Sequence, residues 1–375
     1  MLEKLKLDFK VLRELDFVLF ITMIVTVFFG CVNIYLATKG EVGFAKVEKQ
    51  LIWLGVSLVA IYFVLLVDYI ILQNYAFIFY VIGIILLIIT IVAGATVNGA
   101  TGWIKIGGFT MQPSEVAKIG IIVMLAKKIQ DMEGKVNELK NFFILAAYAI
   151  VPVILIVKEP DMGMTMVCFF IVLGMFFIAG LNIRVIGGGL VALFLSIVLI
   201  WNSGLIEPYQ KKRITSFLDP AADELNSGLQ LTQSTIGIGS GGFLGSGVSF
   251  SIDSPGGYVS QNVPEKETDF IFAVIGETWG TVGAIFLLAM YGIIIYRIIT
   301  ISRTSKDVFG QMICVGLAAY FLFAIYQNIG MTIGLMPITG ITLPLISYGG
   351  SSLFTTMLSL GLILNIGMRR KKINF

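Results

Sequence analysis

The stretch TDFIFAVI, at residues 268–275, decides how this chain folds, because a single carboxylate there stands directly before an apolar run. Asp269 follows a long polar segment, 205–268, and every residue of 270–275 is apolar. An ionisable side chain inside a membrane helix costs about 2.5 to 3.5 kcal/mol or more when nothing compensates it. We therefore expect Asp269 to lie at a membrane surface and to have a partner or a chemical task.

The composition of the whole chain predicts an integral membrane protein. Of its 375 residues 57% are hydrophobic and 13% are charged, and the mean hydropathy is +0.93, which leaves too little polar surface for a soluble globule. Ten apolar runs are each about long enough to cross roughly 30 Å of hydrocarbon. They lie at 17–36, 51–70, 75–94, 114–129, 142–157, 162–180, 185–204, 269–299, 309–334 and 345–368. The predicted fold is all-α, a polytopic membrane protein of about ten transmembrane helices with a large extracellular loop between spans seven and eight.

Basic residues predict the orientation of these spans. They cluster near the start of the chain, between spans four and five, after span eight and at 369–372. The positive-inside rule makes these segments cytoplasmic. We therefore treat residues 1–375 as a single transmembrane domain with a cytoplasmic N-terminus, 1–16, and a cytoplasmic C-terminal tail, 369–375. The expected extracellular segments are 95–113, 158–161, 205–268 and 335–344.

Missing residue types narrow the chemistry. The chain has no histidine, which excludes Ser-His-Asp and Cys-His nucleophiles and His-ligated zinc. Its cysteines, Cys31, Cys168 and Cys314, all fall in apolar spans, so we expect small buried side chains without a disulfide or a Cys-bound metal. The net charge of +3 without a basic soluble module predicts no nucleic-acid partner, and no Walker loop is present. Acid or base chemistry falls to Asp, Glu, Lys, Tyr or Cys.

The fourth span begins QPSEVAK, at 112–118, and carries a potential ion pair. Pro113 suits the first helical turn, and Glu115 lies where a helix N-terminus favours negative charge. Glu115 and Lys118 are three residues apart and share a helix face, so they can pair. Two interpretations stay open: part of a functional site, or a self-neutralising pair that lets the helix enter the membrane.

Three further polar segments lie on the expected outer side. Residues 158–161, KEPD, are expected to form a solvated turn. The glycine-rich segments 239–247 and 347–352 suit either close approach to a phosphate or close helix packing. The basic group QKKR, 210–213, is either solvated surface or a seat for an anionic lipid headgroup or a diphosphate. These features leave two classes: an enzyme acting on a lipid-linked substrate, or a transporter with an acidic relay.

A series of short strings then resembles, in order, those of the SEDS family (shape, elongation, division and sporulation). The strings are GWI at 102–104, QPSExxK at 112–118, PDxG at 160–163, RxxSFxDP at 213–220, QS at 233–234, GSGG at 239–242, PE at 264–265, TDFIF at 268–272, PxTG at 337–340, LP at 343–344 and SYGGSS at 347–352. The resemblance covers all ten spans and is strongest to the member that serves cell elongation and rod shape. It implies a peptidoglycan glycosyltransferase, a hexosyltransferase that polymerises lipid II into β-1,4 glycan strands at the outer face of the bacterial cytoplasmic membrane.

The resemblance also implies which residues act. Asp269 matches the aspartate essential for polymerisation, and Glu115 and Lys118 match residues that line a central cavity. Substrate binding is expected from Arg213, Lys49, Gln112, Asp161, Gln233, Ser234, Ser347 and Tyr348. An α-linked donor and a β-linked product require one inverting displacement, in which a carboxylate accepts the acceptor hydroxyl's proton. We assign that role to Asp269.

The departing undecaprenyl diphosphate needs cationic help, from Lys118, Arg213 or a bound divalent cation, and no other cofactor is evident. The resemblance implies a class B penicillin-binding protein, a transpeptidase, docked by its single helix beside spans eight and nine, with membrane lipids as further partners. Three alternatives stay open: a lipid II flippase, the division or sporulation paralogue, and a scaffold for the transpeptidase. The ionisable motif residues gather on the outer half, which favours an enzyme over a transporter that must expose its site to both faces.

Overall fold

The computed structural model of the chain describes residues 13–97, 100–106, 109–203, 211, 215–217, 219, 227–248 and 256–370. The chain divides into two compact units. Unit 1 comprises Met1–Val67, Thr215–Arg297 and Phe321–Met368. Unit 2 comprises Asp68–Ile214, Ile298–Tyr320 and Arg369–Phe375.

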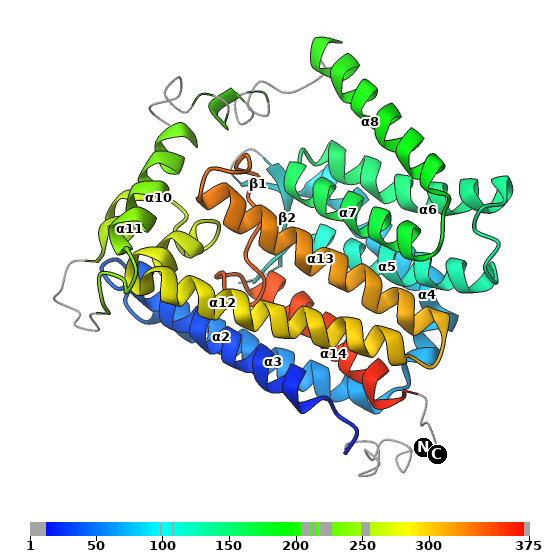
Figure 1. Cartoon of the computed structure of the whole chain (residues 1–375), viewed down its shortest axis with the longest axis horizontal. Helices are drawn as coiled ribbons and strands as arrows, with labels where there is room; N and C mark the ends of the chain where they lie inside the picture. The colour runs from blue at the N-terminus through cyan, green and yellow to red at the C-terminus, as the bar shows by residue number, and fades with distance from the viewer. Residues whose placement is uncertain are drawn as a thin grey trace. The chain divides into compact units, whose positions relative to one another are not determined.

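All regular secondary structure in the described residues of unit 1 is helical. It contains α2 (Phe17–Thr38), α3 (Ala45–Leu66), α10 (Ser227–Gly241), α11 (Tyr258–Asn262), α14 (Gly350–Met368), most of α12 (Ile271–Thr304) and the second half of α13 (Val308–Thr332). Helix α14 packs along α3, and α2 also contacts α3; the three run side by side (Figure 1). The short helix α11 contacts both α2 and α10. Helix α2 begins where the Asp16 carboxylate accepts the N–H of Leu19 at 3.0 Å, as an N-cap does.

Unit 2 adds a small sheet to its helices. Its elements are α4 (Tyr69–Ala93), β1 (Ala95–Val97), β2 (Ala100–Ile106), β3 (Phe109–Met111), α5 (Pro113–Asp131), α6 (Leu139–Lys158), α7 (Met162–Ile178) and α8 (Ile183–Ser203). The strands are antiparallel in the order β1-β2-β3, with Ile104 paired to Met111. The sequence analysis predicted only an extracellular segment here. Helix α5 contacts α4, α6 and α7 (Figure 1), and its side chains Glu115 and Lys118 are buried.

The ten predicted spans are confirmed as helices of the described chain, α2 to α8 and α12 to α14. Seven of them are long and apolar enough to cross a membrane, and α7 and α8 are shorter apolar helices. Helix α5 is the exception because it carries Glu115, Lys118 and further charges. Only 22% of the apolar window of α6 is buried, against 78% for α14, so α6 presents apolar side chains outward as a lipid-facing helix does.

The eighth span departs from the prediction of an uninterrupted helix. Helix α12 is broken at Gly280, whose φ of 61° and ψ of −156° are not helical. The loop 242–247 fills the break with backbone hydrogen bonds. They run from Thr281 to Gly242 (3.0 Å), Val282 to Phe243 (3.2 Å), Ser246 to Glu277 (2.9 Å) and Gly247 to Thr278 (3.3 Å), each from N–H to carbonyl. Backbone groups that the helix leaves unpaired therefore find partners in the loop.

The glycines of this segment allow that close approach. A Cβ on Gly241 would lie 2.0 Å from the carbonyl oxygen of Gly276, and one on Gly245 would lie 2.2 Å from that of Thr278. Close backbone packing, one of the two interpretations of the glycine-rich segment, therefore accounts for it.

Gly280→Ala is expected to destabilise the protein, because a Cβ there would lie 2.4 Å from the backbone nitrogen of Gly245 and φ is positive. We expect a loss of about 1 to 3 kcal/mol. Gly292→Ala, on the same helix, is the matched control: its Cβ would meet no described atom within 4 Å, and alanine should be neutral or stabilising there. Denaturant unfolding in detergent measures both, and equal stabilities would contradict the strained break.

Candidate active site

The backbone directly before α12 is held at three successive carbonyls. The bonds run from the Tyr348 N–H to Glu267 (2.8 Å), from the Ser347 hydroxyl to Thr268 (2.6 Å) and from the Asn328 side-chain amide to Asp269 (2.8 Å). Asp269 is half-buried, and a Cβ on Gly340 would lie 3.6 Å from its carboxylate. The structure thus brings together three predicted site residues, Asp269, Ser347 and Tyr348.

Buried oxygens near this backbone can accept hydrogen bonds. Asn328 donates to the carbonyls of Asp269 and Ile341, the latter at 2.7 Å, but its own side-chain oxygen has no partner among the described residues. The same is true of the side-chain oxygens of Gln327 and Thr339. A buried unsatisfied polar group costs about 1 to 3 kcal/mol. Hydroxyl groups of a bound sugar, or water, are donors that would satisfy them.

A residue that sequence reasoning missed supports Ser347. Gln50 donates its side-chain amide to the Ser347 carbonyl (3.1 Å) and accepts the N–H of Gly349 (3.3 Å). The predicted Lys49, one position earlier on α3, is exposed. Gln50 was discoverable as an amide directly before the predicted span 51–70.

Two other predicted binding residues lie on α10. The Ser234 hydroxyl is buried and donates to the Thr332 carbonyl at 2.8 Å. The side-chain oxygen of Gln233 is buried without a partner among the described residues. Of this pair, Gln233 is the one with bonding capacity left for a ligand.

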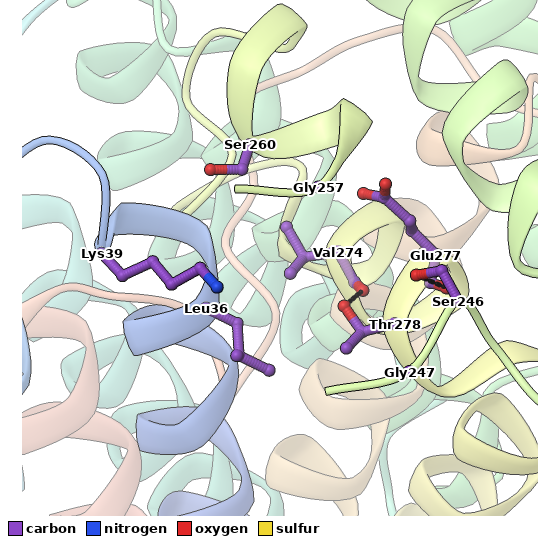
Figure 2. A pocket seen from close by; sticks show the side chains of 9 residues that line it. All are labelled: Leu36, Lys39, Ser246, Gly247, Gly257, Ser260, Val274, Glu277 and Thr278. Carbon is purple, nitrogen blue, oxygen red and sulfur yellow. Dashed lines mark hydrogen bonds between the residues drawn. The ribbon is translucent and has the colours of Figure 1, made fainter. Parts of the chain in front are cut away.

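A carboxylate of α12, Glu277, was also missed. Glu277, 5% exposed, accepts the backbone N–H groups of Tyr258 and Val259, the second at 2.9 Å, and so holds the first turn of α11. It lines a cavity of about 130 Å³ with Lys39, Ser260 and other residues (Figure 2). An acidic residue within an apolar span was the signal that could have found it.

In unit 2 the predicted pairing of Glu115 with Lys118 is confirmed. Their carboxylate and ammonium are 2.8 Å apart, and the side chains are 6% and 1% exposed. The Lys118 ammonium also lies 3.5 Å from the centre of the Tyr320 ring, a cation–π contact. The Lys118 ammonium is thus paired inside the protein, as we expect if the pair only lets the helix enter the membrane. A catalytic role for the pair stays a prediction.

Gln112 and Asp161, predicted to bind substrate, bind each other. The Gln112 side-chain amide donates to Asp161 Oδ2 at 2.9 Å, while Asp161 Oδ1 accepts the N–H of Met164 at 2.9 Å. The second bond caps α7. Asp161 therefore links the start of α5 to the start of α7.

The prediction of a solvated turn at 158–161 was wrong for Glu159. Its side chain is fully buried, and neither carboxyl oxygen has a hydrogen-bond partner among the described residues. The nearby Thr90 hydroxyl donates its proton to the Leu86 carbonyl at 2.7 Å. Burial first, and then the charge of Asp161, raise the pKa of Glu159 to about 8. Glu159 is thus mainly a neutral acid at pH 7.

The predicted residues therefore fall into two groups. Unit 1 holds Asp269, Lys49, Gln233, Ser234, Ser347 and Tyr348, and unit 2 holds Glu115, Lys118, Gln112 and Asp161. Arg213 lies outside the described residues. The cysteines are buried free thiols, as predicted. Among the residues that the structure describes, no three His, Cys, Asp or Glu side chains come together as a metal site.

Known proteins resemble this chain over almost its whole length. The family model for FtsW, RodA and SpoVE, described as "Cell cycle protein", matches residues 12–372. Stage V sporulation protein E of Bacillus subtilis is 32% identical over 94% of this chain and 96% of its own. The peptidoglycan glycosyltransferase MrdB of Escherichia coli is 32% identical over 96% and 95%.

Solved structures agree with the fold. A chain from "Structural coordination of polymerization and crosslinking by a peptidoglycan synthase complex" has a TM-score of 0.82 at 30% identity, over 94% of this chain and 97% of that one. The rod shape determining protein RodA of Thermus thermophilus has a TM-score of 0.72 at 27% identity, over 96% and 98%.

Lys118→Met is expected to lower the free energy of unfolding by about 3 to 5 kcal/mol, because Glu115 would stay buried without its cation. Glu115→Gln with Lys118→Met removes both charges and should recover most of that loss. Lys127→Met, a half-buried lysine on the same helix, is the control and should change stability by about 0.5 kcal/mol or less. Denaturant unfolding in detergent measures all three; a wild-type value for Lys118→Met would contradict the buried pair.

Glu159 should make stability depend on pH. Its pKa is raised from 4.5 to about 8, so the folded chain keeps a proton that the unfolded chain loses. The contribution of Glu159 to the free energy of unfolding is therefore fully present below pH 4.5. It falls as the pH rises towards 8, by at most about 1.4 kcal/mol per pH unit. Glu159→Gln imitates the neutral acid and should lack this fall. Unfolding of both proteins between pH 5 and 9 tests it; a difference that does not change with pH would contradict it.

Proposed function

The chain belongs to the SEDS family, the family of FtsW, RodA and SpoVE, and from this membership we infer that it is a peptidoglycan glycosyltransferase. Its substrate is lipid II, which it polymerises into β-1,4 glycan strands. The observation that carries the proposal is a half-buried carboxylate, Asp269, whose backbone carbonyl accepts a hydrogen bond from Asn328.

The proposed chemistry needs a base that stays in place. Asp269 accepts the proton of the acceptor hydroxyl while that oxygen attacks the anomeric carbon of the donor, and the diphosphate leaves from the opposite face. A positioned general base contributes about 10²- to 10⁴-fold to the rate. With no histidine in the chain, a carboxylate is the leading candidate for that role.

The departing diphosphate needs positive charge. Lys118 is 1% exposed and paired with Glu115, so it would serve only if the pair opened. Arg213 and a divalent cation stay predictions. A divalent cation bound with the diphosphate would supply charge stabilisation to the leaving group.

We also propose where the chain acts in the cell and with which partner. The chain serves cell elongation, resides in the bacterial cytoplasmic membrane with both termini inside, and works beside a class B penicillin-binding protein near α12 and α13. The proposed single transmembrane domain presents residues 205–268 to the outside. A structural relative comes from a complex described as coordinating polymerization and crosslinking, which supports such a partner. The division and sporulation roles are the alternatives within the family.

A lipid II flippase is the alternative from another class. Lipid II supplied in detergent needs no translocation, so polymer formed by the purified chain requires an enzyme and a pure flippase would make none. A scaffold for the transpeptidase predicts normal function after Glu115, Lys118 and Asp269 are substituted together.

Asp269→Asn keeps the shape of the side chain but removes its basicity, so polymerisation of purified lipid II should fall by at least about 10²-fold. The bond from Asn328 to the Asp269 carbonyl should persist, because it involves only the backbone. Glu48→Gln removes an exposed carboxylate of the same unit and should leave the rate unchanged. A near wild-type rate for Asp269→Asn would rule out the general base.

A further inference from the structure

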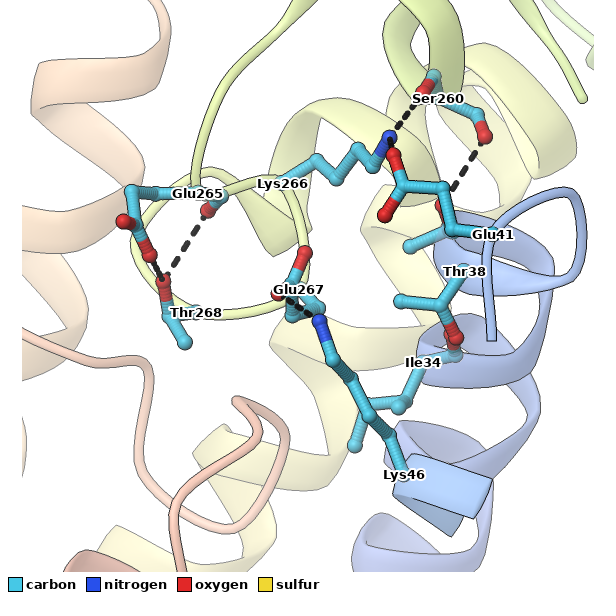
Figure 3. A network of polar contacts seen from close by, with 10 residues as sticks. Ile34, Thr38, Glu41, Lys46, Ser260, Glu265, Lys266, Glu267 and Thr268 are labelled. Carbon is cyan, nitrogen blue, oxygen red and sulfur yellow. Dashed lines mark hydrogen bonds and ion pairs between the residues drawn. The ribbon is translucent and has the colours of Figure 1, made fainter. Parts of the chain in front are cut away.

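Two ion pairs connect the residues just before Asp269 to the turn after α2 and to the first turn of α3. Lys266 and Glu267 are adjacent in sequence, and each pairs with a residue of opposite charge more than 200 positions earlier (Figure 3). Lys266 donates to Glu41 at 2.6 Å, and Lys46 donates to Glu267. We call these four residues the turn clamp. Sequence analysis assigned none of them a role.

The backbone between the turn clamp and Asp269 is short and tightly folded. Glu265 adopts a φ of 54°, and its carbonyl accepts the N–H groups of Thr268 (3.2 Å) and Phe270 (3.1 Å). The Thr268 hydroxyl also lies 3.0 Å from the Glu265 carboxylate. Because this backbone is short and hydrogen-bonded, a displacement of Glu267 would also displace Asp269.

The two sides of this turn are held by different means. Tyr348, Ser347 and Asn328 bind its carbonyls. The turn clamp holds the side chains of Lys266 and Glu267. The Lys46 ammonium also lies 5.9 Å from the centre of the Tyr348 ring. Because the Tyr348 N–H binds the Glu267 carbonyl, Lys46 lies close both to Glu267 and to a residue that holds its carbonyl.

The two pairs differ in burial. Glu267 is 14% exposed and Lys46 is 25% exposed, so water screens their attraction only in part. Glu41 is 57% exposed, and an ion pair so open to solvent contributes little. Lys266 is held in addition by the Ser260 carbonyl, and the Ser260 hydroxyl donates to the Ala37 carbonyl at 2.9 Å. The Lys46–Glu267 pair is therefore the stronger candidate for an effect on Asp269.

We propose that Lys46 and Glu267 are positioning residues for Asp269: their ion pair holds the turn 265–270 so that the carboxylate meets the acceptor hydroxyl. The proposal rests on the proposed role of Asp269. It adds the first turn of α3 to the parts of the chain that control the reaction. Neither residue needs to touch substrate for this effect.

The test exchanges the two charges in the full-length chain. Lys46→Glu and Glu267→Lys each place like charges together, and misplacement of a catalytic group by about 1 Å can cost roughly 10²-fold. We expect each single variant to lower kcat for lipid II polymerisation by about 10- to 100-fold with KM within about twofold. The double variant restores the opposite charges and should return kcat to within about threefold of wild type.

Hydrogen–deuterium exchange gives a second readout that needs no activity. The amides of residues 265–270 should exchange faster in each single variant and regain protection in the double variant. Arg297→Gln is the control. It removes another ion pair of unit 1, with Asp16, whose side chains are 25% and 6% exposed, and should leave exchange at 265–270 unchanged.

The outcomes separate this proposal from the proposed function. A double variant as impaired as the product of the single variants, or unchanged exchange at 265–270, overturns the positioning role. A rise in KM with normal exchange also overturns it, and assigns Lys46 to substrate binding. An active Asp269→Asn protein defeats the general base, while the exchange data still report whether the ion pair fixes the turn.

Discussion

The hydrogen bonds to the carbonyls of residues 267–269 are the interaction on which the arrangement around Asp269 depends. A backbone carbonyl beside apolar helices must find a donor, because water is scarce there. Asn328, Ser347 and Tyr348 supply the donors. Each is fixed in turn: Asn328 also binds the Ile341 carbonyl, and the Ser347 hydroxyl accepts the N–H of Leu343 at 2.8 Å. The hydrogen bonds to this short segment thus connect the start of α12 to α13 and to the chain before α14.

Helix α12 contains a second place where backbone groups find hydrogen-bond partners outside the helix. The break at Gly280 frees backbone groups that the loop 242–247 pairs, and Glu277, just before the break, caps α11. The carbonyl of Ser260, on helix α11, accepts a hydrogen bond from the Lys266 ammonium. Asp269 therefore lies on a segment supported from its carbonyl side by neutral donors and from its side-chain side by charges. If Asp269 is the proposed base, this support leaves it little reorganisation to undergo when the proton moves.

Unit 2 manages its buried charges differently. Glu115 and Lys118 neutralise each other within one helix, whereas Glu159 avoids its charge by holding a proton. Both solutions avoid an ionised group without a partner, which is the costly state in a low-dielectric interior. Asp161, in the same turn, caps α7 and accepts a hydrogen bond from Gln112.

The sequence by itself determined the ten helices, the start of α5 at Pro113 and the Glu115–Lys118 pair, because hydrophobic runs and three-residue spacing depend on near neighbours alone. It also singled out Asp269, Ser347 and Tyr348 through the family strings. Only the tertiary structure decided that Glu159 is buried, that α12 breaks at Gly280 and that Lys46 meets Glu267 across 221 positions. Burial and pairing of this kind depend on which distant segments pack together, and no local pattern of residues carries that information.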